Sequence, residues 1–471
     1  MLVASCLCAV LPARAQIDTL WTRTLGADGS EAASTIIKDG ADFVIAGTRL
    51  FDPEDSFGKG DSYLVKVDAE GRLVWQQTYP ATGLGVEMED VVRTSDGGYL
   101  LVGERYTRSS EGFDHPSTAY YLKVKGDGEM AWEKTFQFGQ FHNTGFSTVT
   151  RSTQGGFIAG GYIEGGRACC VGVVVAQLDE AGSVGWHAGE NTIRGLVGSV
   201  LVSERQGGDV LLVARWRALL RLRAGGDFET IRNYREDAEY GAFSYAIQTT
   251  DTDYVVTSEA DDRLVATRLD SAGTLLWQRP FDIAHDNNEK APVVELIDGG
   301  FLIAVKASIG PDDLMVMKLD ARGNTLFEQT FDIPGDEITV KAAVADGEQV
   351  VLVGETKRGE EMDIWLTKVG FSTATSIKQA PGDLPGTLLG KTYPNPFRTE
   401  TVIPFHIGQP AYVTVTVYDL LGREITVLAE GFYGPGGYAV TWDGAGAGSG
   451  LYVCHLQAGT HAETKLLILQ R

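Results

Sequence analysis

The sequence predicts an all-β protein made of a seven-bladed β-propeller, residues 16–370, and a small immunoglobulin-like β-sandwich, residues 391–471. Three observations support this prediction. A turn motif with a fixed glycine recurs along the chain, a second glycine turn alternates with it, and both lapse before a last group of short alternating segments. No long stretch has the apolar spacing of an amphipathic helix, so we expect helices to be nearly absent.

The first motif begins with an apolar residue that is usually followed by an aspartate. Two further residues, a glycine, three more residues and an aromatic residue complete it. Its glycines fall 44 to 57 residues apart, which is the spacing of propeller blades. These glycines are Gly71, Gly128, Gly182, Gly226, Gly273 and Gly323. The aromatic residue is usually tryptophan, and we expect it to pack between neighbouring blades, because a large flat side chain fills the gap between two sheets.

The second motif is a glycine turn followed by an apolar run. The copies are Asp39-Gly40, Asp96-Gly97-Gly98, Gly155-Gly156, Gly207-Gly208, residues 251–253, Asp298-Gly299-Gly300 and Asp346-Gly347. Such pairs supply the positive φ that tight hairpins need. Each of the seven units therefore reads as four short strands. A unit of this size cannot bury both of its faces alone, and radial stacking gives it a neighbour on each side.

The two ends of the propeller region predict how the ring closes. The seventh unit supplies three strands and breaks off at Gly370, before any fourth strand. A fourth-strand sequence without its three partners stands at residues 17–25. We expect this segment to pair with residues 364–369, which would complete the seventh blade and remove an open sheet edge.

Residues 1–15 read as a signal peptide, with an apolar run that ends in Ala13-Arg14-Ala15 and cleavage expected after Ala15. No later segment is apolar for long enough to span a bilayer. Beyond the signal peptide, three cysteines remain, too few for a disulfide framework. Cys169 and Cys170 form either a vicinal disulfide or two free thiols, and Cys454 is expected to be buried.

The chain carries 63 acidic and 40 basic side chains, a formal net charge of −23. This charge disfavours binding to nucleic acid or to anionic membranes. Four irregular loops, 51–61, 81–90, 108–117 and 282–290, are expected on one face of the propeller, where repeat scaffolds usually carry function. The candidate ligand- or cation-binding residues in these loops are Asp52, Asp55, Asp61, Glu87, Glu89, Asp90, Asp282 and Asp286. Oxygen ligands of this kind suit Ca²⁺, but no calcium-loop spacing occurs, and solvated acidic loops are the simpler interpretation.

No catalytic motif is present: the sequence lacks HExxH, GxSxG, a phosphate loop and CxxC. We therefore nominate no catalytic residue. The leading hypothesis is a non-catalytic surface propeller that binds a glycan, a polymer or a protein. One alternative is an extracellular enzyme, a polysaccharide hydrolase or lyase whose two carboxylates come from different blades. A third is a structural component of the cell surface.

Residues 371–390 are rich in Thr, Pro and Gly and read as a linker. After them, about seven short segments alternate apolar and polar residues, as strands with one buried face do. Ordered motif residues mark this region: Tyr393, Pro394, Asn395, Pro396, Phe397, Asp419, Gly422, Arg423, Gly450, Tyr452 and Lys465. Together they resemble the type A sorting domain of type IX secretion substrates over residues 391–471.

This resemblance implies Sec export to the periplasm and transport across the outer membrane by the type IX secretion machinery. It also implies secretion or attachment to surface lipopolysaccharide. The propeller resembles the DGG-repeat regions of such cargo, and its turn motif resembles the tryptophan-docking repeat of PQQ-like quinoproteins. A Cys169–Cys170 disulfide would suit a quinoprotein, but the seven-fold repeat does not, and the metal-binding Glu, Asn and Asp cannot be aligned.

Overall fold

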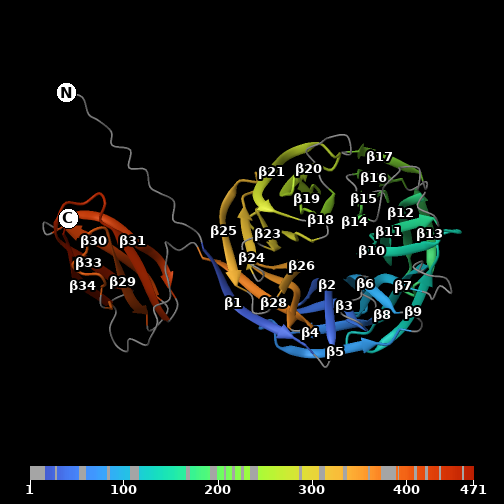
Figure 1. The fold of residues 1–471 in the computed structure, drawn as a ribbon, viewed down its shortest axis with the longest axis horizontal. Coiled ribbons are helices and arrows are strands. Elements are labelled where there is room, and N and C mark those ends of the chain that lie inside the picture. Colours follow the sequence, from blue (N-terminus) through green and yellow to red (C-terminus); the bar gives the residue numbers. More distant parts are fainter. Residues whose placement is uncertain are drawn as a thin grey trace. The chain divides into compact units, whose positions relative to one another are not determined.

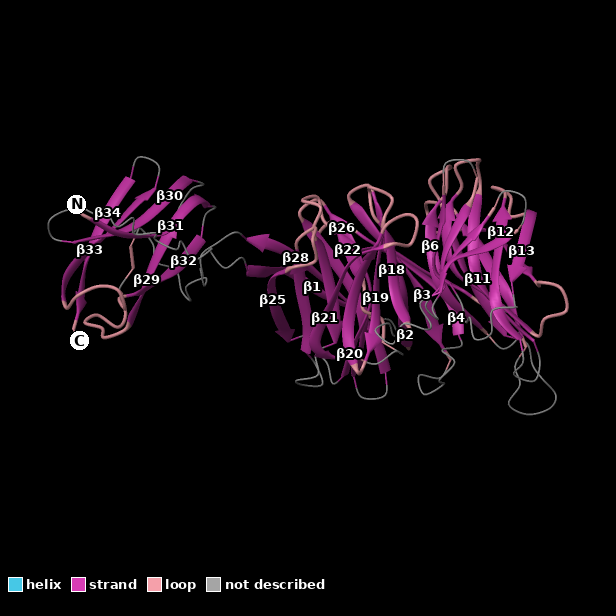
Figure 2. Ribbon diagram, turned by 90° about the horizontal axis from the view of Figure 1, so that it is seen from above, coloured by secondary structure: helices cyan, strands magenta, loops and turns pink. Residues whose placement is uncertain are grey.

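A computed structural model provides the structure of the chain. It describes residues 16–470 except 27–28, 52–59, 82–84, 107–115, 166–169, 191–198, 206–207, 215–217, 224–226, 234–241, 286–288, 307–312, 333–336, 359–360, 373–388, 391, 408–410, 420–422, 434–435 and 459–460. The predicted signal peptide and most of the predicted linker therefore lie outside the described residues. The described residues form strands β1 to β34 and no helix, which confirms the all-β prediction (Figure 2). Two compact units result, one of residues 19–370 and one that contains residues 371–471.

In the larger unit, four antiparallel strands follow one another in each group, and we call them A to D from the centre outwards. The first three groups are β2 (Ser30–Asp39), β3 (Asp42–Leu50), β4 (Gly60–Val67), β5 (Leu73–Tyr79); β6 (Val86–Arg93), β7 (Tyr99–Tyr106), β8 (Ser117–Val124), β9 (Met130–Phe136); and β10 (Asn143–Arg151), β11 (Phe157–Gly165), β12 (Cys170–Leu178), β13 (Val184–Glu190). A single residue pair, Gly60 with Val86, joins the first two groups into one sheet.

The same order continues around the unit. The later groups are β14 (Ser199–Glu204), β15 (Val210–Ala214), β16 (Ala218–Leu222), β17 (Phe228–Asn233); β18 (Phe243–Gln248), β19 (Tyr254–Ala260), β20 (Arg263–Leu269), β21 (Leu275–Ala284); β22 (Val293–Glu295), β23 (Phe301–Lys306), β24 (Asp313–Leu319), β25 (Thr325–Asp332); and β26 (Glu337–Asp346), β27 (Gln349–Arg358), β28 (Glu361–Ser372) with β1 (Gln16–Leu25).

The innermost strands define a β-propeller. Each A strand contacts the A strand of the next group, from β2 through β6, β10, β14, β18 and β22 to β26, and β26 contacts β2 again. Figure 1 shows these strands around the centre and the D strands on the outside. Between neighbouring groups lie separate apolar clusters, such as the one that joins Val102 of β7 to Phe157 of β11. The core is thus a ring of sheet-to-sheet interfaces.

The strand at the N-terminal end closes the ring as the sequence predicted. The last sheet has the order β1-β28-β27-β26, so β1 is its D strand. The hydroxyl groups of Thr22 and Thr367 lie 3.1 Å apart between the two strands. Trp21 packs against the apolar cluster that this group shares with β2 to β4. Pairing between the two ends of the domain covers the edge of β28, which would otherwise be exposed.

The predicted packing of tryptophans between groups is confirmed, and it explains the fixed glycine of the turn motif. Each described docking pair joins a D-strand tryptophan to the C–D turn glycine of the next group: Trp21 with Gly71, Trp75 with Gly128, Trp132 with Gly182 and Trp277 with Gly323. A Cβ atom on Gly182 would lie 2.4 Å from the Trp132 ring, and Gly182 has a φ of 76°. Glycine is therefore required for two reasons: the turn needs a positive φ, and the tryptophan side chain leaves no room for a Cβ atom.

The aspartates of the A–B turns bind basic residues of the C strands in the same group. These pairs are Asp39–Lys66 at 2.8 Å, Asp96–Lys123 at 2.8 Å, Asp298–Lys318 at 2.6 Å and Asp346–Lys368 at 2.6 Å. The hydrogen bond from Lys123 lowers the pKa of Asp96 to about 2. Much of the acidic character of the repeat is therefore structural. We call this side of the ring, where the A–B and C–D turns lie, the turn face.

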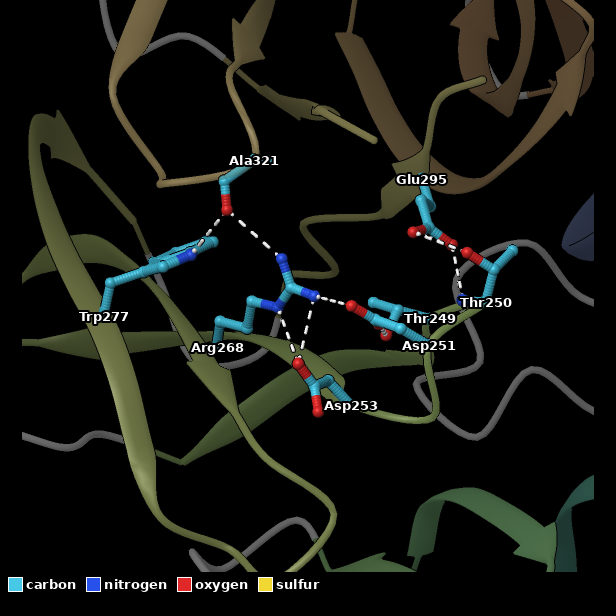
Figure 3. A network of polar contacts seen from close by, with 8 residues as sticks. All are labelled: Thr249, Thr250, Asp251, Asp253, Arg268, Trp277, Glu295 and Ala321. Atoms are coloured by element: carbon cyan, nitrogen blue, oxygen red, sulfur yellow. Dashed lines mark hydrogen bonds and ion pairs between the residues drawn. The ribbon is translucent and has the colours of Figure 1, made fainter. Parts of the chain in front are cut away.

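Figure 3 shows the most extended of these contacts, around Arg268 of β20. The guanidinium lies 3.0 Å from Asp253 and also pairs with Asp251, and it donates to the carbonyl oxygen of Ala321 at 3.2 Å. The indole nitrogen of Trp277 donates to the same carbonyl at 3.1 Å. Because Ala321 belongs to the next group, the turn, the docked tryptophan and the ion pair together join two groups.

The C-terminal unit is a β-sandwich. One sheet pairs β29 (Glu400–Ile407) with β32 (Gly436–Asp443), and the other has the order β31 (Glu424–Tyr433), β30 (Ala411–Asp419), β33 (Gly450–Ala458), β34 (His461–Leu469). Phe405, Val415, Trp442 and Leu467 are buried between them. Cys454 is buried there too, as expected. The structure has six strands here among the described residues, and the immunoglobulin-like strand order stays a prediction.

Candidate functional site

A repeated β-bulge shapes the inner surface of the ring. In six A strands, the register with the B strand skips one residue, so two residues face one partner. The skipped residues are Ser34, Glu89, Ser147, Val200, Ser244 and Lys341. All of them lie in the first half of the A strand, towards the face where the irregular loops join. We call that side of the ring the loop face.

Charged residues from three groups and a carbonyl oxygen from a fourth meet at this level. The ammonium of Lys290, which precedes β22, lies 3.8 Å from the Glu89 carboxylate of β6 and 3.5 Å from the carbonyl oxygen of Ser34 in β2. Lys341 of β26 lies close enough to Glu89 and Glu87 for their charges to help raise its pKa, although the charge of Glu355 is the largest cause. Since β26 separates β22 from β2 around the ring, Lys290 reaches across the mouth of the central channel.

A small cavity of about 100 Å³ opens beside these residues. Its lining consists of Glu289, Lys290, Lys306, Thr339, Val340 and Lys341. Lys306 lies 3.7 Å from Glu289 and 3.7 Å from Glu337, while Lys341 lies 3.0 Å from Glu355. Three of the ion pairs at this site are thus longer than a direct hydrogen bond, and such a gap can hold a bridging water or hydroxyl group. We refer to the cavity, Glu87, Glu89 and Ser34 together as the channel mouth.

Beneath the mouth, the side chains of Asp90 in β6 and Tyr245 in β18 lie close enough to interact. Burial raises the pKa of Asp90 to about 6, although the backbone amides of Val149 and Val91 each donate to its carboxylate at 2.9 Å. Tyr245 hydrogen-bonds with the backbone of Ala343 in β26, and burial together with the charge of Asp90 raises its pKa. Tyr245 therefore links β18 to both β6 and β26.

A chain of carboxyl and phenol groups lies on the β6 side of the mouth. The hydroxyl of Tyr106 lies 2.9 Å from Glu87 and 2.9 Å from Glu104, and the hydroxyl of Tyr162 lies 2.5 Å from Glu104. Burial is the largest cause that raises the pKa of Glu87, to about 8, and the charges of Glu89 and Glu104 raise it further. Burial also raises the pKa of Glu104.

The structure brings together three of the predicted site residues and separates two others. Glu87, Glu89 and Asp90 meet at the mouth, but the expectation that they lie in a loop is wrong, because β6 already begins at Val86. Asp61 lies in β4 and accepts a hydrogen bond from the Ala81 amide at 2.8 Å. Asp282 lies in β21, with 95% of its side chain exposed, 3.7 Å from Arg263.

The predicted residues Asp52, Asp55 and Asp286 lie outside the described residues, as does Cys169. Across the residues that the structure describes, no group of three or more His, Cys, Asp or Glu side chains is arranged to hold a metal ion. Sequence reasoning missed Lys290, Lys306, Lys341, Glu104 and Tyr106. The sequence held one signal that residues 86–89 form a strand rather than a loop. Glu87 and Glu89 alternate with Val86 and Met88, as residues do in a strand with one polar face.

The motif residues of the C-terminal unit tie its entry segment to its last strand. Asn395 donates to the carbonyl oxygen of Leu466 at 2.8 Å and accepts from the amide of Ile468 at 2.8 Å. The Phe397 amide donates to the Ile468 carbonyl at 2.9 Å. Lys465 donates to the carbonyl oxygens of Leu389 and Gly390 at 2.6 and 2.7 Å.

Three other motif residues stabilise turns. Asp419 forms an ion pair with Arg423 at 2.7 Å, and Tyr452 donates to the carbonyl oxygen of Gly448 at 2.7 Å. Gly422 lies outside the described residues. The motif residues thus define a sandwich that is tied together at its entry segment and its last strand, and the chain joins such a sandwich to a β-propeller.

Comparison with known proteins identifies the C-terminal unit. The family model of the secretion system C-terminal sorting domain matches residues 391–470. These residues are therefore a sorting domain of the type IX secretion system, and the protein is exported across the outer membrane to the cell surface or the medium. No curated protein matches the chain in sequence. Within the described part of the chain, there is also no helix long and apolar enough to cross a membrane.

Solved structures similar to the chain are distant. One is PorZ, described as an essential bacterial surface component of the type IX secretion system of Porphyromonas gingivalis, at 11% identity and a TM-score of 0.35, covering 94% of this chain and 70% of PorZ. The extracellular domain of BT3049 from B. thetaiotaomicron has 10% identity and a TM-score of 0.42, with 95% of this chain and 57% of that one covered. The Dos1 propeller has 10% identity and a TM-score of 0.43, with 74% and 95% covered.

Proposed function

We propose that the protein is a non-catalytic binding module, which type IX secretion delivers to the outside of the cell and whose channel mouth binds an extracellular glycan. The observation that carries the proposal is the convergence of loosely paired lysines and carboxylates from three groups around one cavity. In this proposal, residues 1–15 are a signal peptide, residues 16–370 form the seven-bladed propeller, and residues 371–390 link it to an immunoglobulin-like sorting domain. Attachment of the exported chain to surface lipopolysaccharide belongs to the same proposal.

The spacing of the ion pairs favours a ligand rich in hydroxyl groups. A sugar hydroxyl can accept from an ammonium and donate to a carboxylate, and the 3.7–3.8 Å gaps at Lys306 and Lys290 leave room for such an exchange. Each of the three lysines in the lining lies within 3.8 Å of a carboxylate, so a strongly charged ligand of either sign would meet like charges. A neutral or weakly charged glycan meets complementary groups on all sides.

One observation favours an enzyme as the second candidate. A carboxyl group with a pKa near 8, as in Glu87, is protonated at neutral pH and can serve as a general acid in glycoside cleavage. The same glycan would then be a substrate. Release of reducing ends from the bound glycan, lost in Glu87→Gln, would support this candidate against the binding module.

The binding test compares two lysines of the same sheet on opposite faces. The full chain is applied to an array of bacterial, plant and algal glycans, with Lys306→Met as the test variant and Lys318→Met, on the turn face, as the matched control. A hydrogen bond to a charged group contributes ~1.5–3 kcal/mol, so Lys306→Met should weaken binding about ten-fold or more. Lys318→Met should bind as the wild type does. Wild-type protein that binds no glycan on the array, or equal binding by all three proteins, would contradict the proposal.

A further inference from the structure

The carboxyl and phenol groups on the β6 side of the mouth have too few protons for the hydrogen bonds that they make. Tyr106 carries one hydroxyl proton, yet its oxygen lies 2.9 Å from a carboxylate oxygen of Glu87 and 2.9 Å from one of Glu104. A hydroxyl group can donate only once, although it can also accept. Both contacts are hydrogen bonds only when one of the two carboxyl groups is itself protonated and donates to Tyr106.

The strand register imposes the same requirement. Glu87 of β6 and Glu104 of β7 are directly opposite each other in the ladder. Two like charges in such a pair destabilise a sheet, and burial increases the repulsion. Only 8% of Glu104 is exposed, whereas Glu87 is partly buried, so solvent reaches the pair mainly from the Glu87 side. A proton on one carboxyl group removes the repulsion and supplies the missing donor.

We infer that Glu87, Tyr106 and Glu104 hold one extra proton in common at neutral pH, and that its release switches the charge of the channel mouth. In the protonated state, Glu87 donates to Tyr106, Tyr106 donates to Glu104, and Glu104 also accepts from Tyr162. Loss of the proton leaves two carboxylates facing one hydroxyl group. The proton site itself stands without any ligand, whereas its effect on binding rests on the proposed function.

Some of the groups that face Glu87 raise its pKa and others lower it. Glu89 on the same strand and Glu104 on β7 raise its pKa, while the hydroxyl of Tyr106 and the ammonium of Lys290 lower it. The ammonium of Lys341 on β26 also interacts with the charge of Glu87. Burial outweighs the lowering contributions, and the pKa of Glu87 reaches about 8. Burial and the two carboxylates raise the pKa of Tyr106, so its hydroxyl stays protonated throughout this range. The proton that leaves is therefore a carboxyl proton.

Carboxyl-carbon NMR of the full chain labelled with [5-¹³C]glutamate tests the inference. One glutamate signal should titrate with a midpoint near pH 8, and this step should be absent in Glu87→Gln. The amide of that variant can donate to Tyr106 as the protonated acid does, so the variant should fold. Glu89→Gln is the matched control on the same strand: it removes a neighbouring charge but no member of the hydrogen-bonded chain, so the step should persist at a lower pH.

Two further variants distinguish a proton that the three groups share from a proton that one buried carboxyl group holds alone. Glu104→Gln removes the opposing charge and should move the step towards the ordinary range of glutamate. Tyr106→Phe removes a hydrogen bond to the carboxylate and should move the midpoint of the step to a higher pH. The inference is overturned if every glutamate finishes titrating below pH 6, or if the alkaline step survives Glu87→Gln. Glycan binding that weakens above pH 8 in the wild type but not in Glu87→Gln would show that the proton controls the ligand site. If glycan binding fails while the NMR step is present, only the proposed function is wrong.

Discussion

The two faces of the propeller use the same residue types at different distances. On the turn face, aspartates and lysines lie 2.6–2.8 Å apart within one group, at positions that the repeat motif fixes. At the channel mouth, Lys290 and Lys306 lie 3.7–3.8 Å from glutamates around a cavity, and Glu89 and Glu337 among these glutamates belong to other groups. Direct pairs satisfy each other and hold turns in place, whereas pairs with a gap keep donors and acceptors available. The turn face thus stabilises the fold, and the comparison supports the proposal that the mouth binds a ligand.

Ring closure should have the largest effect on stability. Deleting residues 17–25 removes the D strand of the last group and the packing of Trp21. Loss of a buried tryptophan alone costs ~3–5 kcal/mol, and the exposed sheet edge adds to this. Chemical unfolding of the full and shortened chains measures the difference. Equal stability would show that β1 does not close the ring in solution.

Loss of tryptophan docking should have the second-largest effect on stability. Trp277→Ala removes a side chain that packs on Gly323 and Phe301 of the next group, and should lower the free energy of unfolding by ~3–5 kcal/mol. Trp186→Ala provides a control, since 39% of Trp186 is exposed and less packing is lost. Urea denaturation of both variants checks this. A larger loss in Trp186→Ala would contradict the assignment of docking to the buried tryptophans.

Stability should also fall with rising pH because of Glu87. Its pKa is about 8 in the folded chain and 4.5 ordinarily, so between these values the folded state binds more protons than the unfolded state. The contribution is fully present below about pH 4.5 and is lost by about pH 8. Melting temperatures of the wild type should decline more steeply across this window than those of Glu87→Gln. Parallel curves for the two proteins would mean that Glu87 has an ordinary pKa.

The smallest expected effects on stability come from two lysine variants, and they compare the turn face with the channel mouth directly. Lys318→Met on the turn face removes a 2.6 Å pair with Asp298 and should cost about 1 kcal/mol, because the pair is half-exposed. Lys306→Met at the mouth breaks only contacts of 3.7 Å and should change stability by less than about 0.5 kcal/mol. Thermal unfolding of both variants measures this. A larger loss for Lys306→Met would show that the mouth is structural.

Some features follow from the sequence because they depend on local chemistry. Positive-φ glycines fix the turns, the spacing of glycine and tryptophan fixes the docking between groups, and the unpartnered D-strand sequence at residues 17–25 predicts ring closure. The sorting domain is equally readable, because Asn395, Phe397 and Lys465 contact backbone groups that any such sandwich presents.

The channel mouth depends on tertiary structure. A bulge such as that at Glu89 or Lys341 appears only when the register between two strands is known, and it decides which side chain turns towards the channel. Lys290 and Glu89 are separated by most of the ring in sequence, and only its closure brings them within 3.8 Å. The sequence alone therefore determines the turns and the docking, because these are contacts between neighbours in a repeat, and it identifies the export domain by its ordered motif. The folded ring alone decides which charges meet at the channel mouth, because those contacts cross from one group to another, and the register between β6 and β7 decides which carboxyl groups share a proton.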